Sequence, residues 1–177
     1  LDVLLGGELN LSYLTGLTEE FPQEAEKQYL QRCRFHQSHM ALCIYHIFKA
    51  QTLYLHEQPE AALACLTMAA QHLSTVLNTI LLPAYNFYHS LVLIALYPTI
   101  DQKKQTDYWH QLENNQQQMK QWAEQCPANF EHQYLLVAAE MARLSRQDLA
   151  AMDLYDQAIE LARKVNFNHI KPLAYEL

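Results

Sequence analysis

The clearest alternation of apolar and polar positions lies in residues 131–165, where two apolar stripes recur every three or four residues. Spacing of this kind places apolar side chains on one face of an α-helix. A short polar turn separates the stripes, so the segment predicts a helical hairpin. The first stripe consists of Leu135, Ala138, Ala139, Ala142 and Leu144, and the second of Met152, Tyr155, Ala158, Ile159 and Ala162.

Small side chains in this hairpin predict that its two helices approach closely, with an aromatic ring filling the seam. An order of small, large and small residues at offsets of four and three occurs twice, at Ala151, Tyr155 and Ala158 and at Ala62, Leu66 and Ala69. This spacing resembles a tetratricopeptide unit. We therefore expect an all-α fold, a tetratricopeptide-like α-solenoid of stacked antiparallel helical hairpins.

Prolines mark the expected helix ends, because proline fits a first helical turn and disrupts a helix interior. A further break is expected near His36 to Ser38, with a helix from His39 to Leu55; one long helix through this point is the alternative. The first helices of successive hairpins are expected to begin near residues 39, 83, 131 and 170. Their separations, roughly 40 to 48 residues, exceed the 34 of a regular tetratricopeptide array. The prolines are Pro22, Pro59, Pro83, Pro98, Pro127 and Pro172.

This pattern predicts a single helical-repeat domain over residues 1–177, forming part of a larger protein. Its expected parts are a connector (1–20), the first hairpins (21–80), a central hairpin (81–127), the tetratricopeptide-like hairpin (128–167) and the start of another unit (168–177).

Composition supports the all-α interpretation and narrows the partners. The chain has 3 glycines, none after Gly16, although β-hairpins usually draw on glycine for positive φ. A net charge of -7 without a basic run argues against nucleic acid. The longest apolar run, near Leu91 to Leu96, is too short to span a membrane. The 4 cysteines show no CxxC pair, which indicates reduced thiols and a cytoplasmic location.

Few residues of the sequence suggest phosphate binding, catalysis or metal binding. The absence of glycine beyond Gly16 argues against a phosphate-binding glycine loop. Cys126 has no neighbouring cation or expected helix N-terminus to activate its thiol. Metal binding would need ligands from more than one helix, because a helix rises about 20 Å over the thirteen residues that contain the candidates. We expect no metal, no cofactor and no enzymatic activity in this segment. The metal candidates are Cys33, His36, His39, Cys43 and His46.

Two surfaces are candidates for recognition. Trp109, Trp122 and Tyr108 form a possible aromatic patch, although aromatic residues at helical spacing more often lie in a core. By analogy with tetratricopeptide hairpins, whose first helices line a concave groove, a second surface is expected to bind an extended peptide or a helix of a partner. Its residues would be Gln51, Tyr54, Gln133, Glu140 and Arg143; simple solvation of these positions is the alternative.

Residues 87–167 resemble the helical region of bacterial multi-domain sensor kinases, in which a serine/threonine-kinase-like domain and an AAA-type ATPase precede helices, a GAF domain and a histidine kinase module. The matching segments are YHSLVLIALYP, QMKQWAEQCPANFEHQYLLVAAEMARL and AMDLYDQAIELARK. The resemblance implies a docking or signal-relay segment that contacts flanking domains of its own chain or a signalling partner. No catalytic residue of such kinases has a counterpart here.

A different class of function remains open. Helical domains attached to signalling ATPases can sense small molecules, and such a role predicts an apolar cavity with a few convergent polar groups. Tyr85, Asn86 and His89 would lie near it. The oligomeric state is left open by the sequence.

Overall fold

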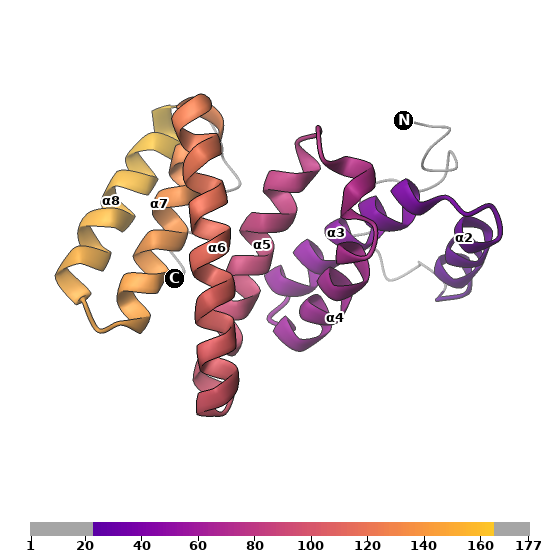
Figure 1. Ribbon diagram of the computed structural model, residues 1–177, viewed down its shortest axis with the longest axis horizontal. Helices are drawn as coiled ribbons and strands as arrows, with labels where there is room; N and C mark the ends of the chain where they lie inside the picture. Colours follow the sequence, from indigo (N-terminus) through magenta and orange to yellow (C-terminus); the bar gives the residue numbers. More distant parts are fainter. Residues whose placement is uncertain (1–22, 165–177) are drawn as a thin grey trace. The chain divides into compact units, whose positions relative to one another are not determined.

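The computed structural model describes residues 23–164, and within that range helices joined by short turns make up the chain, with no strand (Figure 1). In chain order the α-helices are α2 (Gln23–Phe35), α3 (His39–Leu55), α4 (Pro59–Ala70), α5 (Leu81–Leu96), α6 (Gln102–Gln125), α7 (Pro127–Leu144) and α8 (Asp148–Lys164). Two short 3-10 helices, η1 (Leu73–Val76) and η2 (Tyr97–Thr99), flank α5. No helix among these residues is both long enough and apolar enough to cross a membrane.

The chain divides into two units at residues 88 and 89, within α5. In the first unit α3 packs against α2, α4 and η1. In the second, α7 packs against both α6 and α8. Figure 1 shows α7 and α8 lying side by side as a hairpin. The predicted connector (1–20) and the predicted start of another unit (168–177) lie outside the described residues, and the predicted domain limits stay predictions.

Three turns between consecutive helices share one backbone conformation. Gln37, Glu57 and Arg146 each have a positive φ of 52° to 58°. In each turn the N–H of the next residue donates to a carbonyl five residues back, as from Ser38 to Cys33 at 2.8 Å. The positive-φ residue itself donates to a carbonyl three residues back. These two hydrogen bonds define a Schellman motif, which satisfies carbonyls that the helix end leaves unpaired.

Most predicted helix boundaries are confirmed. The break after Phe35, the helix His39–Leu55 and the start at Pro59 agree with the structure. Pro127, predicted to close a helix, also begins α7, four residues before the expected start. Within the predicted central hairpin (81–127), α6 begins at Gln102, where the Asp101 carboxylate accepts a hydrogen bond from the Lys104 N–H at 3.0 Å and caps the helix.

Each unit has its own buried residues. In the first, Cys43, Ile47, Ala69 and Val76 form a cluster. In the second, the large buried side chains include Leu112, Met119 and Leu136. The small residues of both repeated motifs are buried as predicted, at Ala62, Ala69, Ala151 and Ala158.

One residue of the second predicted apolar stripe, Met152, does not face the core as predicted. Met152 is 63% exposed, and Ala151 beside it is 3% exposed. Because neighbouring residues on a helix point about 100° apart, only one of the two can face the core. The smaller Ala151 is the one turned inward, which suits a hairpin whose helices pack against each other on small side chains.

Candidate functional site

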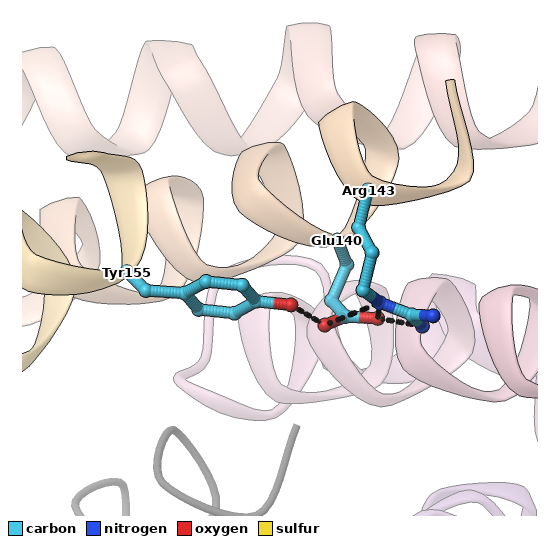
Figure 2. Close-up of polar contacts among 3 residues, drawn as sticks. All are labelled: Glu140, Arg143 and Tyr155. Atoms are coloured by element: carbon cyan, nitrogen blue, oxygen red, sulfur yellow. Dashed lines mark hydrogen bonds and ion pairs between the residues drawn. The ribbon is translucent and has the colours of Figure 1, made fainter. Parts of the chain in front are cut away.

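The hairpin of α7 and α8 encloses a buried carboxylate. Glu140 on α7 has no exposed surface. Arg143, one turn further on, donates from Nη2 to Glu140 Oε2 at 2.5 Å and from Nε to both carboxylate oxygens at 3.2 and 3.3 Å. The Tyr155 hydroxyl of α8 donates to Glu140 Oε1. Figure 2 shows the two donors meeting the carboxylate from opposite sides.

This arrangement explains how a carboxylate is kept in the interior. Burying a charge is costly unless that charge is paired and hydrogen-bonded, and both conditions are met at Glu140. The pair also ties α8 to α7, since Tyr155 reaches across the hairpin. Arg143 keeps 45% of its side chain exposed, so part of its guanidinium faces the surface.

The predicted groove residues on α7 therefore divide by burial. Glu140 cannot contact a partner directly, because it is wholly buried, and we assign it to the interior of the hairpin. Arg143 is exposed and Gln133 is half-buried. The Gln133 Oε1 atom has no hydrogen-bond partner among the described residues.

The predicted groove residues on α3 belong to the first unit. Tyr54 is half-buried, and its ring packs edge-on against Tyr88 with 6.1 Å between centroids. Gln51 is also half-buried and hydrogen-bonds the Tyr88 hydroxyl. Burial raises the pKa of Tyr88 to about 12, and the Gln51 hydrogen bond acts in the opposite direction. The groove residues predicted on α3 therefore lie in the first unit, and those predicted on α7 lie in the second.

Two of the candidate metal ligands, Cys43 and His46, are buried and contact neighbouring protein groups. The Cys43 thiol is buried and lies 3.6 Å from the Ala69 carbonyl, which it contacts as a weak donor. His46 is buried against the Tyr45 ring, and burial lowers its pKa. Within residues 23–164 no group of three or more His, Cys, Asp or Glu side chains is placed to hold a metal ion.

The residues predicted to surround a sensor cavity also take part in packing. Tyr85 packs against the Cys43 cluster, and Asn86 is buried. His89 lies within hydrogen-bond distance of the Asn115 amide, 3.1 Å away, and the same amide donates to Ser90. Burial lowers the pKa of His89 to about 4.

Cys126 requires a correction. The sequence predicts no helix N-terminus near this residue, but the structure places Cys126 at the N-cap of α7. Its side chain makes no capping hydrogen bond there. Pro127 follows the end of α6 directly and also lies in the first turn of α7, so one proline marks both helix boundaries.

The predicted aromatic patch is half-buried and divided between two contacts. Trp109 packs against Tyr97 at 6.0 Å and donates to the Glu113 carboxylate at 3.0 Å. Trp122 packs against Phe130 at 6.3 Å. The two tryptophans thus contact different neighbours within the second unit.

Comparison with known proteins agrees with the hairpin architecture. A family model described as CHK1-like, TPR repeats, meaning tetratricopeptide repeats, matches residues 19–171. No curated protein and no solved structure matches significantly. The match spans most of the chain and confirms the predicted class, an all-α tetratricopeptide-like α-solenoid. The chain therefore belongs to the family of CHK1-like TPR repeats.

Proposed function

We propose that this chain is a non-catalytic protein-interaction or signal-relay scaffold within a multi-domain sensor kinase of the cytoplasm. The observation that carries the proposal is the tetratricopeptide-repeat family match over residues 19–171, since such repeats generally bind other proteins. The sensor-kinase setting is supported by the resemblance of residues 87–167 to the helical region of those kinases.

The partner contacts we propose lie on the first helices of the hairpins, one set in each unit. Gln51 and Tyr54 on α3, with Gln133 and Arg143 on α7, are partly or largely exposed polar groups. Polar side chains of this kind can pair with the backbone of an extended peptide or with a partner helix. Glu140 would act indirectly, because it holds the guanidinium of Arg143 in one orientation.

Gln133 offers a specific acceptor for this role. Its Oε1 lacks a partner among the described residues, and an unsatisfied buried acceptor is costly. A small rotation that brings Oε1 to a partner N–H would remove that cost, so binding would gain from it.

A direct test measures binding of the 177-residue chain to purified flanking domains of its parent protein, by calorimetry. Gln51→Ala and Gln133→Ala are each expected to weaken binding about fivefold, the value of one neutral hydrogen bond of about 1 kcal/mol. Gln117→Ala, at an exposed position of α6, is the matched control and should leave binding unchanged. Equal affinities for all three variants would contradict the proposed contacts.

The same preparation tests the small-molecule alternative. A thermal midpoint that rises with a metabolite, and not with any flanking domain, would replace the scaffold proposal by the sensor function. A rise with a flanking domain alone would support the scaffold.

A further inference from the structure

The second unit contains a cleft of about 370 Å³ between the start of α6 and the end of α7. Its volume falls within the range of small-ligand sites, roughly 300 to 1,000 Å³. Gln133, a proposed partner contact, lies about 17 Å before Leu144 along α7, so the cleft is a different place. The lining residues are Tyr97, Thr106, Trp109, His110, Leu144 and Ser145.

Two aromatic rings form one side of this cleft. The rings of Tyr97 and Trp109 meet edge to face, with 6.0 Å between their centroids. Both side chains are half-buried, so each ring keeps part of its surface open to a ligand. The face of a tryptophan ring attracts a cation that lies within about 6 Å of the ring centre. The aromatic side of the cleft therefore favours a positively charged group.

A carboxylate stands beside these rings. Thr106, Trp109 and His110 line the cleft from one face of α6. Glu113 follows one turn later on the same face, since residues three and four apart on a helix are neighbours. The Trp109 indole N–H donates to Glu113 Oε1 at 3.0 Å, and the His110 ring lies 3.3 Å from Oε2. The Glu113 side chain is 55% exposed, and a carboxylate has about four acceptor sites, so it can also accept from a ligand.

The opposite side of the cleft adds acceptors. Leu144 and Ser145 lie at the end of α7, and within residues 23–164 no N–H donates to either backbone carbonyl. The C-terminal end of a helix carries a partial negative charge, which favours a cation. Arg143 is paired with Glu140, and neither it nor Arg146 lines the cleft. The lining thus contains no lysine or arginine that would repel a cation.

We infer that this cleft binds a cationic side chain, lysine or arginine, on a segment of a partner protein. The cation lies against the rings of Trp109 and Tyr97. Its N–H groups donate to the Glu113 carboxylate and to the carbonyls at the end of α7. The net charge of -7 favours the approach of a basic segment. The inference rests on the proposed scaffold function, because the ligand belongs to another protein.

The test follows the indole N–H signals of the 2 tryptophans in the ¹⁵N-labelled chain during titration with four short peptides. The peptides differ only in a central lysine, its uncharged analogue norleucine, arginine, or its uncharged analogue citrulline. The Trp109 signal is expected to shift with the lysine peptide, the arginine peptide or both, and to shift little with the uncharged peptides. The stronger cationic peptide identifies the preferred side chain. The Trp122 signal is the internal control, because Trp122 packs against Phe130 and does not line the cleft.

Two pairs of residues on α6 provide matched variants, with affinity measured from the backbone amide signal of His110. Trp109→Leu is expected to weaken binding of the cationic peptide about fivefold by removing the cation–π contact, whereas Trp122→Leu should change it little. Glu113→Gln is expected to weaken binding about threefold by removing one partly exposed charge. Glu124→Gln makes the same change of charge at an exposed residue outside the lining and should change affinity little.

Three results would each overturn the inference. They are a Trp109 signal that moves with neither cationic peptide, equal binding of the charged and uncharged peptides, and equal losses in a variant and its control. The titration uses no flanking domain, and Gln51 and Gln133 stay unchanged throughout. Failure here is therefore distinguishable from failure of the scaffold function, which the flanking domains test.

Discussion

Replacing Arg143 by methionine is expected to destabilise the hairpin of α7 and α8, because it leaves a buried carboxylate without its cation. Glu140 has no exposed surface, and Arg143 supplies its contacts at 2.5, 3.2 and 3.3 Å. After the substitution only the Tyr155 hydroxyl still donates to it. Methionine preserves most of the aliphatic packing of arginine, so the change isolates the charge.

The magnitude follows from the burial of the two partners. Removing one member of a fully buried ion pair costs about 3 to 5 kcal/mol. Because 45% of the Arg143 side chain is exposed, water screens part of this interaction. We therefore expect the free energy of unfolding to fall by about 2 to 3 kcal/mol.

Urea unfolding followed by tryptophan fluorescence suits this measurement, because both tryptophans, Trp109 and Trp122, lie on α6 in the same unit as the pair. Lys120→Met is the control, since it removes an exposed ion pair with Glu124 at 3.9 Å on α6 and should change stability little.

A double variant makes the test sharper. Glu140→Met combined with Arg143→Met removes the buried charge together with its partner, and replacing both members by apolar groups is often close to neutral. The double variant should therefore be more stable than Arg143→Met alone. If it is less stable, or if Arg143→Met costs no more than Lys120→Met, the buried carboxylate is not the source of the effect.

Three further predictions concern a turn, a cap and a buried histidine. Glu57→Gly should raise the free energy of unfolding by about 0.5 to 1 kcal/mol, because glycine accepts the positive φ of 57°. Ala61→Gly, inside α4, should lower the free energy of unfolding by a similar amount. Equal effects of the two substitutions in urea unfolding would contradict this prediction. Asp101→Ala should cost about 1 kcal/mol by removing the cap of α6, and Asp107→Ala, exposed within α6, should cost less in the same assay. Since burial lowers the pKa of His89 from 6.5 to about 4, the unfolded state binds the proton more tightly, and stability should fall by up to about 3 kcal/mol as pH drops from 6.5 to 4. His89→Gln should flatten that dependence in urea unfolding at several pH values, and an unchanged slope would refute the assignment.

The features predicted from sequence are those set by local physics. Pro59 at a helix start and the break before His39 depend on backbone restrictions that a few neighbouring residues determine. The inward position of Ala151 and Ala158 depends on helical periodicity. Each of these is a property of a short segment, and each agrees with the structure.

The features missed from sequence depend on residues far apart or on an unusual conformation. A glutamate on a helix is ordinarily exposed, and Glu140 is buried because Tyr155, fifteen residues later, meets it across the hairpin. A cleft lined by Arg32 and His39 forms where α2 packs against α3, although these two residues are close in sequence. Cys126 was misjudged because a single proline both ends one helix and begins the next.

The three Schellman turns connect these observations. The sequence lacks glycine after Gly16, and the turns use Gln37, Glu57 and Arg146 in a conformation that costs a residue with a Cβ about 1 to 2 kcal/mol. Unlike glycine, each of these three residues places a side chain at the point where two helices meet. Gln37 lines a cleft between α2 and α3, so the residue that completes this turn also forms part of the wall of that cleft. Two backbone hydrogen bonds hold each turn whatever side chain it carries, and the side chains there can therefore suit a partner without altering the hairpin.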